Sequence, residues 1–284
     1  MPQILKSVRC ANSLGQHDMA YADWGDADSE RTILCVHGLT RNGRDFERLA
    51  AALEADGYRV LCPDIVGRGR SDRLPEGAPY EIPQYIRDVT ALLAQENVTK
   101  VDWIGTSMGG LIGMAMAALP QTPIRRMVLN DVGPFIPKAA LERIGEYVGI
   151  GWRFDSFDKA VDHIKRAYAP FGLTSEEDWR YLTEISTVKD DTGGWVNAYD
   201  LRIAEPFKAA EIGDADLWAL WDVLSVPIMV MRGAESDLLT PDVAEEMTRR
   251  GPMAQVVEIT GCGHAPALMD THQIDLLRDW CRSA

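Results

Sequence analysis

The pentapeptide GTSMG, residues 105–109, places a serine between two glycines, after a strand-like run and before an apolar helix-like run. Glycines allow a sharp turn there and remove side chains that would collide with neighbouring elements. Such a turn projects the Ser107 hydroxyl out of the backbone, where the following helix N-terminus favours negative charge. A serine hydroxyl is a poor nucleophile near neutral pH, so this chemistry also requires an imidazole that accepts the proton.

The segment ITGCGHAPAL supplies such an imidazole, because His264 follows the last strand-like run of the chain. A carboxylate at the second ring nitrogen would fix the tautomer of the imidazole and stabilise its protonated form. Asp237, in MRGAESDLLTP, is the first candidate for this carboxylate. Glu235 and Asp131 are its rivals.

The elements that must position these residues alternate between strands and helices. Short runs rich in Val, Ile and Leu predict strands buried on both faces at residues 32–38, 59–64, 101–105, 127–131, 227–233 and 255–261. Apolar residues at helical spacing predict helices within residues 44–57 and 82–97. This order predicts an α/β fold with a mostly parallel central sheet and helices on both faces. Residues 17–25, preceded by a turn, predict an antiparallel N-terminal hairpin.

The alternation stops in residues 134–222, where helical patterns occur without a convincing strand. We therefore expect a core in two parts, residues 1–133 and 223–284, with a helical cap of residues 134–222 between them. Five of the eight tryptophans lie in this cap, and their main role is expected to be packing. Phe135, Trp152 and Trp195 are the candidates for lining a substrate pocket.

Four motifs resemble those of the α/β-hydrolase family, over nearly the full length of the chain: GTSMG, HGLT (residues 37–40), DIVGRGRSD (residues 64–72) and the C-terminal pair of acid and histidine. The resemblance implies that Ser107 is the nucleophile and that the backbone N–H groups of Met108 and Leu39 form the oxyanion hole. It implies a structural role for His37. The order of serine, acid and histidine also agrees with the family. The resemblance favours Asp237 as the acid because its surrounding segment, GAESDLL, matches the usual position of the acid, although some members take the acid from the end of the preceding strand, as Asp131 would be.

In the same family, the loop of residues 64–72 is expected to brace the site through backbone turns and local hydrogen bonds. Arg68 and Arg70 within it are expected to be solvated surface residues, although contact with an anionic substrate is an alternative.

Composition narrows the class of protein further. A formal net charge of −14 disfavours a nucleic-acid partner, which would require a clustered positive surface. The N-terminus lacks the apolar core of a signal peptide, and no run approaches the ~20 apolar residues of a membrane span, so we expect a cytoplasmic protein. Five irregularly spaced cysteines argue against a disulfide framework. Without a metal-ligand spacing or a GxGxxG motif, we expect neither a metal nor another cofactor.

The resemblance and a serine at the turn together predict a serine hydrolase that cleaves carboxylic esters through an acyl-enzyme on Ser107. Esters of short to medium acyl chains with aryl or alkyl alcohols are the expected substrates. The family resemblance adds aliphatic polyesters as further candidate substrates. An apolar pocket favours neutral or weakly polar esters. The alternatives are a carbon–carbon bond hydrolase of ring-cleavage products, a cofactor-free perhydrolase, and a ligand sensor that retains the fold. The oligomeric state is not predicted.

Overall fold

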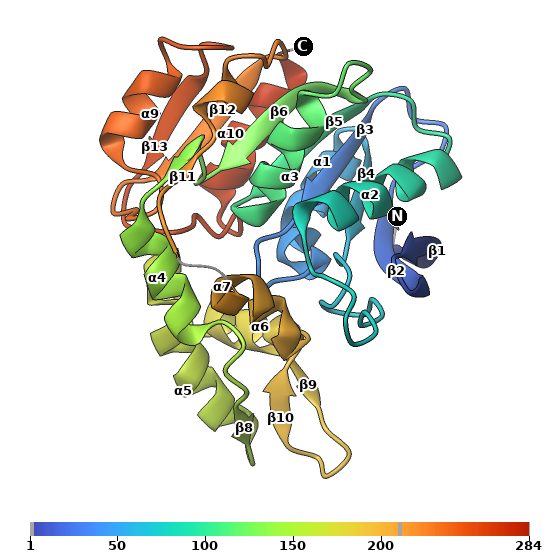
Figure 1. Ribbon diagram of the computed structural model, residues 1–284, viewed down its shortest axis with the longest axis vertical. Coiled ribbons are helices and arrows are strands. Elements are labelled where there is room, and N and C mark those ends of the chain that lie inside the picture. The colour runs from blue at the N-terminus through green and yellow to red at the C-terminus, as the bar shows by residue number, and fades with distance from the viewer. Residues whose placement is uncertain (1–2, 210–211, 284) are drawn as a thin grey trace.

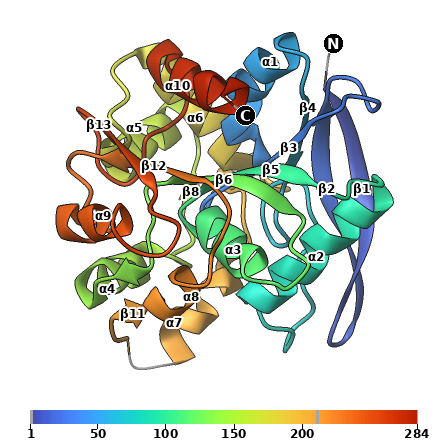
Figure 2. The ribbon, with the colours of Figure 1, turned by 90° about the horizontal axis from the view of Figure 1, so that it is seen from above.

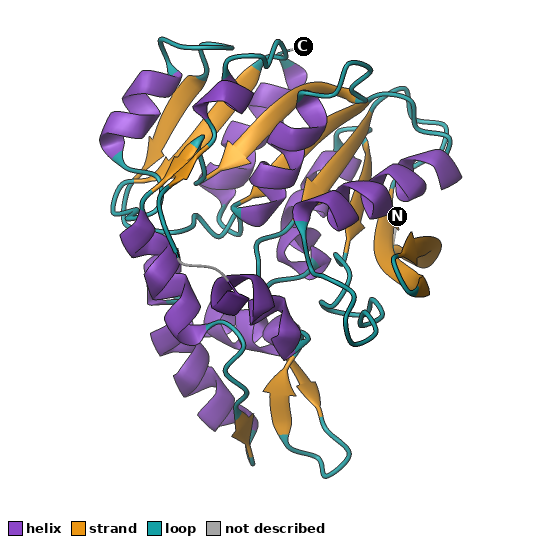
Figure 3. Cartoon of the chain, in the orientation of Figure 1, coloured by secondary structure: helices purple, strands orange, loops and turns teal. Residues whose placement is uncertain are grey.

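The computed structural model describes residues 3–209 and 212–283. Its centre is an eight-stranded sheet in the order β1-β2-β4-β3-β5-β6-β12-β13 (Figures 1 and 3). These strands are β1 (Ile4–Asn12), β2 (Gly15–Trp24), β3 (Thr32–Val36), β4 (Arg59–Pro63), β5 (Val101–Thr106), β6 (Ile124–Asn130), β12 (Ile228–Gly233) and β13 (Gln255–Ile259). The antiparallel N-terminal hairpin is confirmed, since β1 pairs with β2 in antiparallel register at the edge of the sheet.

The remaining strands, from β4 to β13, pair in parallel, as the alternation of strands and helices predicts. Strands β3 and β4 are buried along their whole length. Strand β13 differs from its prediction, because it lies at the other edge of the sheet and only Ile259 is buried. An edge strand has a neighbour on one side only, which leaves its side chains more exposed.

Helices cover both faces of the sheet (Figure 2). The helices are α1 (Glu47–Ala55), α2 (Ile82–Gln95), α3 (Met108–Ala117), α4 (Lys138–Tyr147), α5 (Phe157–Ala167), α6 (Glu176–Ser186), α7 (Glu205–Ala209), α8 (Trp218–Trp221), α9 (Pro241–Met247) and α10 (Thr271–Arg282). Apolar residues of α1 and α10 belong to one core cluster, those of α2, α3 and α9 belong to a second, and those of α5 and α6 form a third. Every helix in the described part of the chain is too short or too polar to cross a bilayer.

The segment between β6 and β12 carries α4 to α8, and its helices α4 to α7 lie at one end of the sheet (Figure 1). The prediction that it lacks strands is wrong. Strands β8 (Arg153–Phe154), β10 (Trp195–Asn197) and β9 (Thr187–Lys189) form a three-stranded sheet, and β7 (Phe135–Ile136) pairs with β11 (Ala215–Asp216). Strands of two or three residues are too short to show the alternation by which a strand is recognised in a sequence.

The turn between β5 and α3 depends on close approach of the backbone to its neighbours. A Cβ atom at Gly109 would lie 2.0 Å from the carbonyl oxygen of Val36, and one at Gly105 would lie 2.4 Å from the carbonyl oxygen of Gly109. Real side chains do not tolerate such distances from backbone atoms. Gly109 therefore allows α3 to pack directly against the end of β3, and Gly105 allows α3 to pack directly against β5.

Replacing Gly109 by alanine is expected to lower the free energy of unfolding by about 3 kcal/mol, although alanine favours helices, because the new methyl group meets rigid backbone. Urea unfolding of Gly109→Ala and of wild type measures this. Gly213→Ala is the matched control, since a Cβ at Gly213 meets no atom within 4 Å. Equal stabilities of the two variants would contradict the packing argument.

Candidate active site

Ser107 occupies the sharp turn between β5 and α3. Its backbone has φ 50° and ψ −113°, a conformation that residues other than glycine rarely adopt. The amide of Ser107 donates to the carbonyl of Asn130, and its own carbonyl accepts from the amides of Gly110 and Leu111. These bonds, together with the packing of the neighbouring glycines, hold the side chain at the start of α3.

His264 joins Ser107 from the loop that follows β13. Its Nε2 atom lies 3.0 Å from Oγ of Ser107, and its Nδ1 atom lies 2.7 Å from Oδ2 of Asp131. An ionised carboxylate can only accept, so the proton belongs on Nδ1, and Nε2 is then free to accept from the serine hydroxyl. This is the arrangement in which an imidazole can activate a serine for attack on a carbonyl group.

Asp131 lies directly after β6 and has no exposed surface. Its Oδ1 atom accepts from the amide of Gly233 at 2.8 Å, and its Oδ2 atom accepts from the hydroxyl of Ser236 at 2.6 Å as well as from His264. The residue itself adopts a φ of 57°. The buried carboxylate is therefore held in a fixed orientation toward the imidazole.

The prediction of Asp237 as the partner of His264 is wrong. The Asp237 side chain is 52% exposed and accepts two hydrogen bonds from Arg143, at 2.6 and 2.9 Å. Glu235 also forms no hydrogen bond to His264 in the structure, where Asp131 occupies the position at Nδ1. Asp131 follows β6 and Asp237 follows β12. These strands are parallel neighbours in the sheet, so the two candidate acids come after strands that end at the same edge.

The HGLT segment and the loop of residues 64–72 support each other. His37 is fully buried, and its Nε2 atom accepts from the amide of Ile65 at 2.9 Å, which confirms a structural role. Asp64 accepts from the amides of Gly43 and Arg70, as expected of a bracing loop.

Arg68 is buried, with 1% of its surface exposed, so its prediction as a surface residue is wrong. Its guanidinium donates to the carbonyls of Leu39 and Val66 and to the hydroxyl of Tyr85. Arg70, which is about one-third exposed, is held by the Asp64 carboxylate. Arg68 therefore ties the segment that carries Leu39 to α2.

Two cavities meet at Ser107. The larger, of about 310 Å³, is mostly apolar and is lined by residues of α2, α3, α4 and α7 together with Leu39 and Met108. The smaller, of about 70 Å³, is lined by both Ser107 and His264. The serine hydroxyl can thus reach a bond that lies across both cavities.

The predicted pocket residues lie elsewhere. Trp152 lines a separate cavity and contacts Phe154 and His163. Trp195 packs against Phe157 and beneath Lys189, and Phe135 packs against the core from β7. Trp152 and Trp195 serve the packing of this segment, whereas Ile144 and Phe207 of the same segment line the cavity at Ser107. No local sequence pattern distinguishes these two roles.

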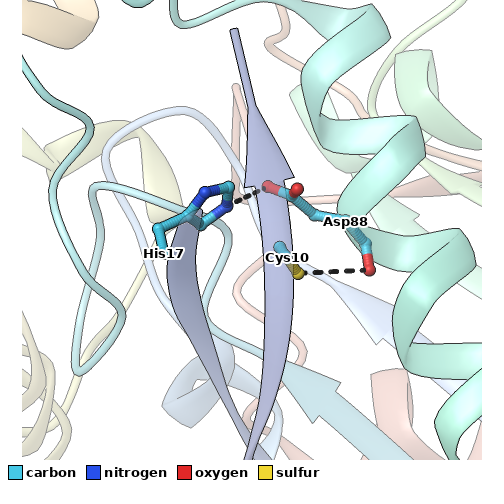
Figure 4. Close-up of side chains that lie close together, drawn as sticks. All are labelled: Cys10, His17 and Asp88. Carbon is cyan, nitrogen blue, oxygen red and sulfur yellow. Dashed lines mark hydrogen bonds and ion pairs between the residues drawn. The ribbon is translucent and has the colours of Figure 1, made fainter. Parts of the chain in front are cut away.

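A second cluster of reactive residue types lies between the N-terminal hairpin and α2 (Figure 4). Ligand atoms of Cys10, His17 and Asp88 lie within 4.8 Å of one another, and all three residues are buried. Both ring nitrogens of His17 form hydrogen bonds, Nε2 with Asp88 and Nδ1 with Asn12. Gln84 donates to the second carboxylate oxygen of Asp88. These side chains already satisfy one another, so a metal ion would have to displace existing hydrogen bonds. The described cysteines are all buried and free of disulfides.

Comparison with known proteins extends these observations. Residues 31–270 match the sequence pattern of the alpha/beta hydrolase fold. The chain belongs to the α/β-hydrolase fold family. It is similar to a 3-hydroxybutyrate-oligomer hydrolase of Cupriavidus necator, with 45% identity over 94% of each chain. It is also similar to Lipase 1 of Psychrobacter immobilis, with 27% identity over 87% of this chain and 75% of the lipase.

Among solved structures, an alpha/beta hydrolase from Novosphingobium aromaticivorans superimposes with a TM-score of 0.88 at 36% identity, covering 99% of each chain. The relatives of this α/β-hydrolase are named hydrolases, lipases and esterases, and the chain is accordingly a hydrolase of that type.

The burial of His37 has a measurable consequence for stability. Burial lowers the pKa of His37 to about 4, whereas the unfolded chain has the usual value of 6.5. As the pH falls from 6.5 to 4, the unfolded state takes up a proton that the folded state excludes, so stability falls by up to about 1.4 kcal/mol per pH unit. Above pH 6.5 both states are neutral at this position, and His37 contributes no pH dependence.

We expect the acid loss of stability to be shallower in His37→Asn than in wild type, because asparagine does not titrate. Urea unfolding between pH 7 and about pH 4.5 measures the slope. His272→Asn, at an exposed position, should retain the wild-type slope. Parallel curves for wild type and His37→Asn would contradict the assigned cause.

Proposed function

We propose that this protein hydrolyses carboxylic esters through an acyl-enzyme on Ser107. The observation that carries the proposal is the continuous chain of contacts from Ser107 through His264 to the buried Asp131, located where two cavities meet. Residues 134–222 then act as a cap over the site, with residues 1–133 and 223–284 as the hydrolase core. The part of α4 that lines both cavities supports this division.

In the proposed cycle, Ser107 Oγ attacks the ester carbonyl while His264 Nε2 accepts its proton. The negative charge on the carbonyl oxygen is stabilised by the backbone N–H groups of Leu39 and Met108. Both residues line the larger cavity beside Ser107, and the first N–H of a helix has no partner within the helix. His264 then gives its proton to the departing alcohol, and water attacks the acyl-enzyme with His264 again as the base.

The larger cavity supports acyl groups of short to medium length, because about 310 Å³ is at the lower end of small-molecule pockets. The similarity to a 3-hydroxybutyrate-oligomer hydrolase extends over nearly the whole chain and favours oligomers of short hydroxy acids as substrates. Such oligomers are aliphatic esters with a compact acyl unit. We therefore infer that short hydroxyalkanoate esters are the substrate class.

Replacing Ser107 by alanine should lower kcat for p-nitrophenyl butyrate by at least about a thousandfold, because the nucleophile is removed with little change in packing. Intact mass after treatment with a serine-directed phosphonate should show one adduct in wild type and none in the variant. Ser283→Ala, at an exposed position, is the control. Retained turnover in Ser107→Ala would contradict the proposal. An adduct in wild type without turnover of any ester would favour the carbon–carbon hydrolase instead.

The two candidate acids are separated by matched substitutions. Asp131→Asn should lower kcat for the same ester by about 10³- to 10⁴-fold, because asparagine favours the wrong tautomer of His264. Asp237→Asn should change kcat by less than about threefold, since Asp237 pairs with Arg143 at the surface. The reverse result would restore Asp237 as the acid.

A further inference from the structure

The smaller cavity at Ser107 differs in character from the apolar one. Two arginines, Arg41 and Arg143, and two tyrosines, Tyr147 and Tyr168, are among its lining residues. The side chain of His264 lines this cavity and not the larger one. A substrate that spans both cavities would therefore meet an apolar wall at one end and cationic groups at the other.

The position of His264 fixes which half of an ester occupies each cavity. In the proposed mechanism the imidazole must give its proton to the oxygen of the departing alcohol, so the alcohol half lies on the His264 side. The acyl half then occupies the larger apolar cavity. The smaller cavity, of about 70 Å³, suits a short alcohol.

The two arginines in this cavity are not equally available. Arg41 is buried, forms two hydrogen bonds with Asp45 and lies over the ring of Tyr168, so its guanidinium is committed to the protein. Arg143, on α4, is paired with Asp237 through a two-pronged contact, and both side chains are well exposed, at 39% and 52%. An exposed pair of this kind contributes little stability and exchanges readily with another carboxylate.

We propose that Arg143 binds a free carboxylate on the alcohol half of the substrate, taking the place of Asp237 as its partner. The inference rests on the proposed function and narrows it to esters whose leaving group is a hydroxy acid, as at the carboxyl end of a hydroxyalkanoate oligomer. The planar guanidinium matches the two oxygens of a carboxylate, which Asp237 already demonstrates. The expectation of neutral or weakly polar esters then applies only to the acyl half of the substrate, and the alcohol half carries a negative charge.

The negative net charge of the protein makes a local positive charge such as Arg143 necessary for binding an anionic substrate. With a formal net charge of −14, the molecule as a whole repels anions. An anionic substrate therefore needs a local cation beside the reacting bond. Arg143 supplies it at the cavity that the imidazole faces.

The test compares the linear dimer of 3-hydroxybutyrate as the free acid with its methyl ester, which differs only in the terminal carboxylate. The measured quantity is the ratio of kcat/KM for the free acid to kcat/KM for the methyl ester. Arg143→Gln should lower this ratio about tenfold, mainly through KM for the free acid, and Arg143→Lys should retain part of it. Asp237→Asn should raise the ratio about threefold, because it removes the competing carboxylate.

Arg250→Gln is the matched control, because Arg250 is as exposed as Arg143 and forms a similar two-pronged pair with Asp222, and neither Arg250 nor Asp222 lines either cavity. It should leave the ratio unchanged. An unchanged ratio in Arg143→Gln, or an equal fall in Arg250→Gln, would overturn the inference while Ser107-dependent hydrolysis of both dimers still upheld the proposed function. Failure of the wild type to hydrolyse either dimer or p-nitrophenyl butyrate would overturn both.

Discussion

A carboxylate without exposed surface needs hydrogen-bond donors around it, and Asp131 has three of them from two segments of the chain. The amide of Gly233, the last residue of β12, and the hydroxyl of Ser236, in the loop that follows, both donate to Asp131. The third donor is the imidazole of His264, in the loop after β13. Leaving such a charge unpaired would cost several kcal/mol. The same bonds that satisfy Asp131 therefore fix the carboxyl ends of β6 and β12 and hold His264 facing Ser107.

The two cavities determine how a substrate would be oriented at Ser107 and His264. An apolar cavity on one side of Ser107 suits an acyl chain, whereas the cavity on the His264 side offers arginine and tyrosine. Helix α4 contributes Ile144 to both cavities and Arg143 to the smaller one. Because α4 belongs to the segment inserted between β6 and β12, the core supplies the reacting groups and the insertion supplies much of the selectivity in the proposed function.

Local sequence patterns predicted the parts of the molecule that local physics determines. The serine turn, the buried strands and the N-terminal hairpin each have a sequence signature that is contained within a few consecutive residues. The choice between Asp131 and Asp237 depends on how two neighbouring strands end in space, and both residues satisfy the chain order. The burial of Arg68 and the packing of Trp152 and Trp195 likewise depend on distant segments, and no periodicity reveals them.

The hydrogen bond between Asp131 and His264 is the central claim, and its Nδ1 proton can be observed directly by proton NMR. Such a proton, held between an imidazole and a buried carboxylate, resonates far downfield of the amide protons. The account predicts this resonance in wild type and in Asp237→Asn, and its absence in Asp131→Asn and His264→Ala. A resonance that survives in Asp131→Asn and disappears in Asp237→Asn would contradict it.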